Sequence, residues 1–148
     1  MRGTYIKISI LMAFLWSLGA LTPGCGEIGL GGGGIANDPA PSGTKTKQGV
    51  FQGQNGQTVS GTASIYVDGT TVTLRLENLG VPSGTVLKVV AKSSSTQVLS
   101  KSLRATSGNQ NYTMSSTQGA TTDTVEIQSG TVAPPSNVYG VATLQSVL

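Results

Sequence analysis

Few side chains in this chain could do acid–base, nucleophilic or metal chemistry. The 148 residues contain one cysteine, Cys25, and no histidine. Catalytic sites of the Ser-His-Asp and Cys-His kinds need an imidazole base, so the composition excludes both. The usual zinc sites need several cysteines or histidines and are excluded for the same reason. We therefore expect no catalytic residue, no metal and no cofactor, that is, a protein that is not an enzyme.

The remaining acid–base candidates are two pairs of carboxylates. Asp68 and Glu77 bracket one predicted strand, and Asp123 and Glu126 lie at the start of another. A bare pair of acids is a weak catalytic signal. We interpret Asp68 and Asp123 as turn residues, and Glu77 and Glu126 as solvated positions on strands.

Four aromatic residues, Phe51, Tyr66, Tyr112 and Tyr139, could line a ligand or sugar patch. We favour the interpretation that they are core and rim aromatics of a small β domain. The triplet Asn111-Tyr112-Thr113 matches the glycosylation sequon, and a match this short arises easily by chance.

The N-terminal segment has the three parts of a secretory signal peptide. Residues 1–7 carry Arg2 and Lys7 without an acid, an apolar run follows over 8–18, and small or helix-breaking residues close the segment. The run is shorter than the ~20 residues of a membrane-spanning helix. We predict an exported protein with a signal peptide over residues 1–24, and an uncleaved membrane anchor is the alternative.

The segment around Cys25 resembles a bacterial lipoprotein processing site, in which a small residue precedes a cysteine that is lipidated and becomes the mature N-terminus. Gly24 and Cys25 match this pattern, whereas Thr22 stands where the usual leucine would be, with Leu21 one place early. The resemblance implies a lipid on Cys25 that anchors the protein to the cell membrane or outer membrane, facing the periplasm or exterior. The alternative is ordinary cleavage that leaves a free thiol.

Residues 25–48 are rich in Gly, Pro and polar side chains, including four consecutive glycines at 31–34. This composition predicts a disordered linker that joins the lipidated cysteine to the folded part. Two of the nine basic residues, Arg2 and Lys7, lie in the leader, which leaves seven against six acidic ones. A chain this close to neutral has no electrostatic footprint for DNA or RNA, so we expect no nucleic-acid partner.

From residue 49 to residue 148 the pattern predicts one all-β domain. Apolar and polar residues alternate over 63–68 and 72–77, on either side of Asp68-Gly69, which indicates a hairpin. Residues 86–91 are apolar on both faces apart from Lys88, as in an inner strand. With the further short runs, we expect an antiparallel β-sandwich or barrel of about seven to eight strands.

The order of motifs over this domain resembles the DM13 family, small extracytoplasmic all-β domains proposed to take part in electron transfer. The matching stretches are Gly49-Val50-Phe51, residues 58–63, Leu74-Arg75-Leu76-Glu77-Asn78-Leu79, residues 83–89, Leu103, Gly108-Asn109-Gln110-Asn111-Tyr112 and Tyr139-Gly140-Val141-Ala142-Thr143-Leu144. The usual Gly-Pro-Asp-Leu turn of the family is Gly84-Thr85-Val86-Leu87 here, and Ser129 stands at the position of the family's cysteine. A serine cannot undergo thiol redox cycling, so the family's proposed redox role does not carry over through this residue.

These observations favour a lipid-anchored cell-envelope module, non-enzymatic, that binds an unidentified protein or small-molecule ligand. The alternative is an accessory component of an extracytoplasmic electron-transfer system, as proposed for DM13 domains, that works through another group.

Overall fold

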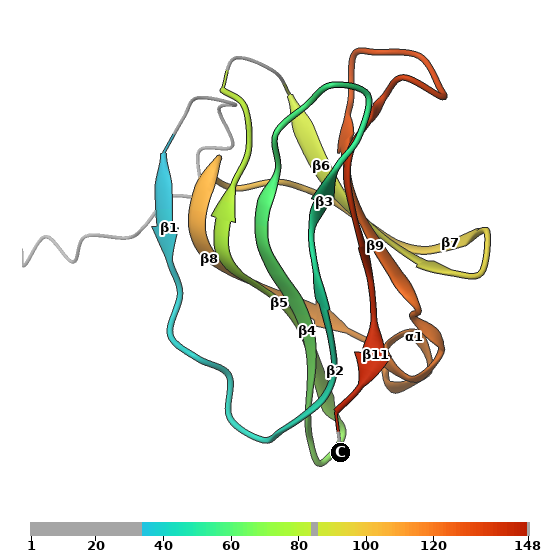
Figure 1. The fold of residues 1–148 in the computed structure, drawn as a ribbon. Coiled ribbons are helices and arrows are strands. Elements are labelled where there is room, and N and C mark those ends of the chain that lie inside the picture. The colour runs from blue at the N-terminus through green and yellow to red at the C-terminus, as the bar shows by residue number, and fades with distance from the viewer. Residues whose placement is uncertain (1–33, 84–85, 148) are drawn as a thin grey trace, which may run out of the picture.

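The computed structural model describes residues 34–83 and 86–147. The predicted signal peptide, Cys25 and residues 26–33 lie outside the described part. In that part, eleven strands and one short helix form two sheets packed face to face (Figure 1). The prediction of an all-β fold is confirmed, and the architecture is an open sandwich, not a closed barrel.

The sheets differ in size, and every strand pair but one is antiparallel. Sheet A has the order β1 (Ile35–Asn37), β8 (Ser107–Met114), β5 (Thr71–Gly80), β4 (Ser60–Asp68), β2 (Thr44–Val50) and β11 (Gln145–Ser146). Sheet B has the order β3 (Gln52–Gly53), β10 (Val138–Thr143), β9 (Thr124–Ser129), β6 (Leu87–Ser93) and β7 (Thr96–Ser102). The exception is β1, which runs parallel to β8. The predicted seven to eight strands are too few, because that number leaves out β1, β2 and the two-residue strands β3 and β11.

The predicted hairpin is confirmed in β4 and β5. Asp68 pairs with Thr71, and Gly69 occupies the first loop position with a φ of 57°, a conformation that glycine adopts without strain. At the other end of β4, Gly61 forms a bulge with a φ of 108°. A Cβ there would lie 2.6 Å from the carbonyl oxygen of Glu77, so the close approach of the two backbones requires glycine.

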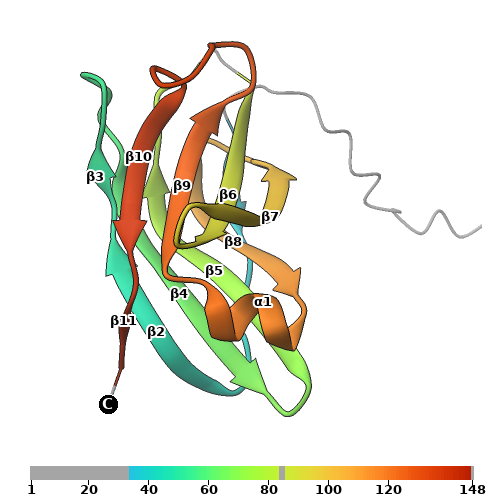
Figure 2. The same cartoon turned by 90° about the vertical axis from the view of Figure 1, so that its right-hand side faces the viewer.

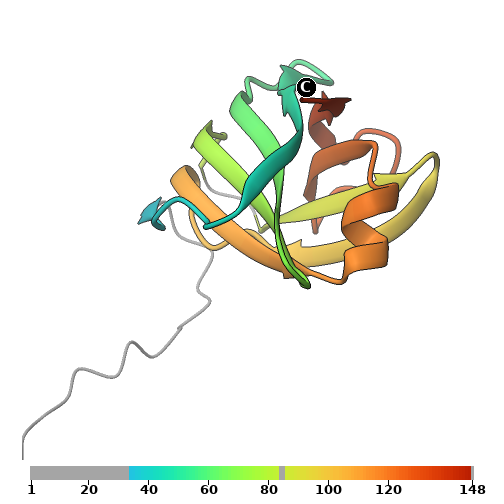
Figure 3. The ribbon, with the colours of Figure 1, turned by 90° about the horizontal axis from the view of Figure 1, so that it is seen from below.

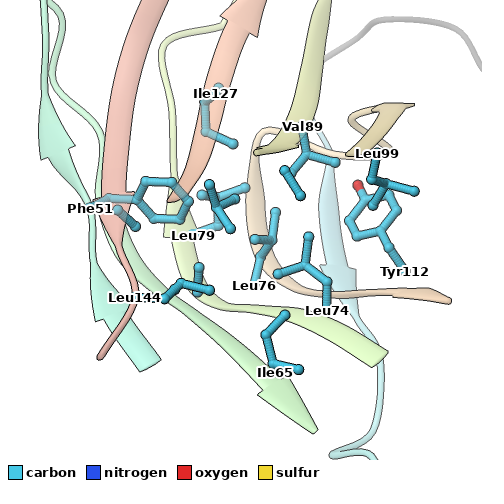
Figure 4. Packing of buried hydrophobic residues seen from close by; sticks show 14 of the residues in the cluster. Phe51, Ile65, Leu74, Leu76, Leu79, Val89, Leu99, Tyr112, Ile127 and Leu144 are labelled. Atoms are coloured by element: carbon cyan, nitrogen blue, oxygen red, sulfur yellow. The ribbon is translucent and has the colours of Figure 1, made fainter. Parts of the chain in front are cut away.

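Alternate residues of the two sheets fill the space between them. Sheet A contributes Ile65, Leu74 and Leu76, and sheet B contributes Val89 and Ile127, all with 1% exposure or less. Figure 4 shows these side chains meeting in one cluster. Burial of apolar area on this scale is the main stabilising term of such a domain.

Along one side of the sandwich, two strands continue almost directly from one sheet into the other. Strand β2 of sheet A leads into β3 of sheet B, and β10 of sheet B leads into β11 of sheet A. The view from below shows the two layers and the β6–β7 hairpin, which projects beyond them (Figure 3). The other side of the sandwich lies between β8 and β7, where the hydroxyl of Tyr112 donates to the carbonyl of Ser102 at 3.5 Å.

The prediction of a disordered linker through residue 48 is wrong for its second half. Strand β1 adds to the edge of β8, and β2 pairs with β4 from Thr44–Val67 to Val50–Thr62. The segment has almost no apolar residues. It is ordered by main-chain pairing within sheet A, and amino-acid composition does not indicate such pairing. The folded part therefore begins before residue 49.

One helix, α1 (Ser116–Thr121), lies beside the lower ends of both sheets (Figure 2). The sequence pattern did not indicate this helix. Ser115 caps it, and Oε1 of Gln118 accepts from the main-chain N–H of Ser115 at 2.8 Å, so the two residues form a capping box. In the ranges 34–83 and 86–147, no helix has the length and apolar character that crossing a bilayer requires.

Candidate functional site

Ser129, which the resemblance to DM13 domains aligns with a cysteine, is the last residue of β9 and is only 2% exposed. Its Oγ accepts hydrogen bonds from the main-chain N–H groups of Thr131 and Val132, at 3.1 and 3.2 Å. Its own N–H donates to the carbonyl of Asn137 at 2.7 Å. The residue thus closes both ends of the loop from β9 to β10. The arrangement gives the hydroxyl a structural role in holding this turn.

The outer face of sheet A carries the most extensive polar network of the described residues. Its centre is Arg75, which points away from the core and is nevertheless only 5% exposed. Residues 38–43, which we call the strap, connect β1 to β2 and cover Arg75. The Nη1 of Arg75 donates to the main-chain carbonyl of Pro39 at 2.7 Å and to Oδ1 of Asn111 at 2.9 Å.

Glu77 lies next to Arg75 on the same face. Its carboxylate accepts from Nε of Arg75 at 3.0 Å and from Nζ of Lys45 at 3.4 Å, and the hydroxyls of Ser64 and Thr62 lie at 3.4 and 3.5 Å. Burial alone would raise the pKa of Glu77, but the hydrogen bond from Arg75 and the charge of Lys45 outweigh it and hold that pKa below its ordinary value. Glu77 is therefore part of an ion-pair network, and the prediction of a solvated carboxylate is wrong.

Asp38 ties the strap to the edge of the sheet. Its carboxylate forms an ion pair with Arg104 and accepts from the main-chain N–H of Asn111 at 2.7 Å. Burial acts to raise the pKa of Asp38, and the hydrogen bonds from Arg104 and Asn111 lower it by more. The Nδ2 of Asn111 donates to Pro39 at 2.9 Å, so the asparagine of the sequon is engaged in the same contact.

The outer face of sheet B carries a second, smaller row of polar side chains. Nζ of Lys92 lies 2.6 Å from Glu126, the amide of Gln128 donates to the other oxygen of that carboxylate, and Asn137 donates to Gln128 at 3.4 Å. We call these four residues the sheet B row. Glu126 is 8% exposed, so the prediction that it is a solvated position is wrong. Val90, beside it in register, is fully buried although it lies on the outer face.

The structure does not bring together either pair of carboxylates from the sequence. Asp68 is at the β4–β5 turn, where it accepts from the hydroxyl of Ser42 at 2.6 Å, whereas Glu77 pairs with Thr62 at the far end of the hairpin. Asp123 lies after α1 and Glu126 lies in the sheet B row. The assignment of Asp68 as a turn residue is confirmed.

Asp123 stabilises a second turn, the connection between β6 and β7. The main-chain N–H of Ser94 donates to its carboxylate at 2.6 Å, and this hydrogen bond lowers the pKa of Asp123. Close by, Nζ of Lys47 donates to the carbonyls of Ala120 and Thr122 at 2.6 and 2.7 Å, at the C-terminus of α1. A cation at the end of a helix is favourable, so this cluster holds α1 against β2.

The aromatic residues divide between the core and the surface. Phe51, Tyr112 and Tyr139 belong to the buried cluster, which confirms their interpretation as core residues. Tyr66 lies on the outer face of sheet A, with Nζ of Lys45 5.5 Å from its ring centre. The structure therefore does not gather the four aromatics into a ligand patch. Among the residues it describes, no three Cys, Asp or Glu side chains are grouped to hold a metal ion.

Comparisons with protein-family models, with curated proteins and with solved structures found no match to this chain. The resemblance to DM13 domains stays a prediction that depends on the quoted motifs alone. The sequence analysis missed the sheet A network and the sheet B row. The alternation along each strand indicated which polar residues lie on the outer faces of the sheets. It did not show which of these residues pair with each other.

Proposed function

We propose that this protein is a lipid-anchored envelope module that binds a polar partner on the outer face of sheet B and is not an enzyme. The leader and Cys25 support the anchor, as argued from the sequence. The absence of histidine and of any cysteine after Cys25 supports a role without nucleophilic or thiol redox chemistry.

We choose the outer face of sheet B because the two outer faces differ in which segments hydrogen-bond to their polar side chains. On sheet A the strap lies over the polar network, and Arg75 uses its donors on the carbonyl of Pro39 and the side chain of Asn111. On sheet B, the side-chain hydrogen bonds of Lys92 and Glu126 among the described residues are made to each other and to Gln128, all within β6 and β9, and none comes from a segment outside the sheet.

The sheet B row is suited to binding because its side chains are already fixed. Lys92 and Gln128 orient the carboxylate of Glu126, and Asn137 orients Gln128, so little side-chain freedom remains to be lost on association. The β6–β7 hairpin extends outward beside this face (Figures 1 and 2). A polar partner with donors and acceptors along an extended surface is the class that fits such a row.

A photo-crosslinking experiment in the bacterial envelope tests this function. Ser100 is exposed and lies in register with Val90 on the outer face of sheet B, and Thr113 is exposed on the outer face of sheet A. A photoreactive residue at Ser100 should give discrete adducts of higher mass, and the same residue at Thr113 should not. Adducts from Thr113 alone, or none from Ser100, would contradict the proposal.

A further inference from the structure

Gly34 lies at one end of the sandwich, which we call the entry end. Its carbonyl accepts from the main-chain N–H of Ser107, and Ser107 pairs with Gly80 at the end of β5. The loop between β9 and β10 reaches the same end, because the N–H of Gly130 donates to the carbonyl of Val86, just before β6, at 2.8 Å. Figure 1 shows the starts of β1 and β6 and the β9–β10 loop in the upper half of the view.

Large apolar side chains are exposed at the entry end. Val86 and Val132 are 57% and 40% exposed, and Ile35, next to Gly34, is 83% exposed. Val86 and Val132 lie beside the same strand pair: Val86 precedes Leu87, which pairs with Ser129, and the N–H of Val132 donates to Oγ of Ser129. Of the other exposed large apolar residues of the described chain, Val50 pairs with Thr62 on a different strand pair of the same half of the sandwich, and Val147 lies toward the opposite end, where its N–H donates to the carbonyl of Thr46.

The charges that are not paired also differ between the two ends. Lys45, Arg75, Lys92 and Arg104 are the cations in the ion pairs of residues 34–83 and 86–147, and Lys47 donates to the carbonyls at the end of α1. Lys88 and Lys101 remain, near the start of β6 and the end of β7 toward the entry end, in register with Ser102 and Val89. The carboxylates outside these ion pairs, Asp68 and Asp123, lie at the opposite end.

The length of chain between Cys25 and Gly34 limits which end can reach a bilayer. Nine residue steps span at most ~30 Å when fully extended. From Gly80, beside the entry point, the ten residues of β5 take nine steps to the opposite end, a distance of about 30 Å. A lipid on Cys25 would therefore let the entry end approach the bilayer freely, whereas the opposite end could reach it only with the connecting chain fully extended.

We infer that the entry end rests on the anionic surface of the bilayer that holds the lipid. Val86 and Val132 enter the headgroup layer, and Lys88 and Lys101 lie over the phosphates, a combination of apolar and basic groups that favours binding at an anionic interface. The inference depends on the proposed anchor at Cys25 and adds an orientation to it. In this orientation the outer face of sheet B faces sideways, away from the bilayer.

Tryptophan fluorescence tests the orientation in the full-length processed protein. Trp16 is the one tryptophan of the sequence and belongs to the predicted leader, so the processed protein has none. Val132→Trp places a reporter at the entry end, and Thr70→Trp places the matched control in the exposed β4–β5 turn at the opposite end. In phosphatidylglycerol vesicles with brominated acyl chains, we expect several-fold stronger quenching for Val132→Trp, with a blue-shifted emission. Adding Lys88→Glu and Lys101→Glu to Val132→Trp should reduce its quenching.

Flotation of the same vesicles separates a failure of the orientation from a failure of the anchor. If the protein floats with the vesicles and the two reporters are quenched equally, or the one at position 70 more strongly, the orientation is wrong and the anchor stands. If the wild-type processed protein does not float, the anchor is wrong and the orientation falls with it.

Discussion

The guanidinium of Arg75 lies beneath the main chain of Pro39, with Nη1 donating to that carbonyl at 2.7 Å. A charged side chain on the outer face of a sheet would ordinarily be solvated, yet here it is almost fully buried. The contact fixes the strap and hence the position of β1 on the edge of sheet A. Through it, the segment that follows the proposed lipid anchor becomes part of the folded domain.

Replacing Arg75 should therefore destabilise the protein more than replacing a typical residue outside the core. Arg75→Ala removes the charged donor that the carbonyl of Pro39 and the side chains of Glu77 and Asn111 share, and we expect a loss of about 2–4 kcal/mol in the free energy of unfolding. Lys101→Ala, at an exposed position, should change it by less than about 0.5 kcal/mol. Urea unfolding of the processed protein measures both, and equal small effects would show that the network does not hold the strap.

Truncation distinguishes the linker from the folded part. Deleting residues 26–33 should leave the melting transition unchanged, because a segment this rich in glycine has few apolar side chains to contribute to a core. Deleting residues 26–48 removes β1 and most of β2, and with them the pairing to β8 and β4. We expect the cooperative transition, followed by circular dichroism, to disappear. A cooperative melt of the shorter chain would mean that these strands are dispensable.

Acid should weaken the network through Asp38 and Glu77. The pKa of each carboxyl is lower in the folded protein than its ordinary value, which is 3.8 for Asp38 and 4.5 for Glu77. In the acid range the folded state therefore binds fewer protons than the unfolded state. The stabilisation from these two carboxylates is complete above their ordinary pKa values, and it is lost as the pH falls through their folded-state pKa values. Urea midpoints between pH 6 and pH 3 should fall less steeply for Glu77→Gln than for wild type. An unchanged slope would contradict the assignment.

A cysteine at position 129 should be shielded from reagents. Ser129 is buried and its Oγ accepts two main-chain hydrogen bonds, a role that sulfur fills weakly, so Ser129→Cys should cost about 1 kcal/mol. In a Cys25→Ala background its labelling by a thiol reagent requires local opening and should be at least about tenfold slower than that of Ser100→Cys on the exposed edge strand. Comparable labelling rates would show that position 129 is open to solvent.

The all-β class and the central hairpin were predictable because the pattern there is local. Ile65 and Leu74 alternate with polar neighbours, and Gly69 marks the turn between their strands. Helix α1 was missed although Ser115 and Gln118 have the spacing of a capping box, since six residues carry no apolar stripe.

Strand β2 and the burial of Arg75 and Glu126 could not be predicted in the same way. The residues of β2 are polar, and their order comes from pairing with β4, which lies about 20 residues further along the chain. Arg75 and Glu126 occupy polar positions of their strands, as the alternation indicates, but their burial depends on partners distant in sequence, Pro39 and Lys92. Ser129 lies at the end of β9, and its hydrogen bonds to the following loop could be found only in the structure.

The intact mass of the membrane-extracted protein tests the central claim, an envelope module anchored by a lipid on Cys25, most directly. The account predicts a polypeptide that begins at Cys25 and carries the added mass of a diacylglyceryl group, together with release of the Cys25→Ala variant into the soluble fraction. A wild-type mass equal to that of an unmodified polypeptide, from whichever residue it begins, would contradict the account.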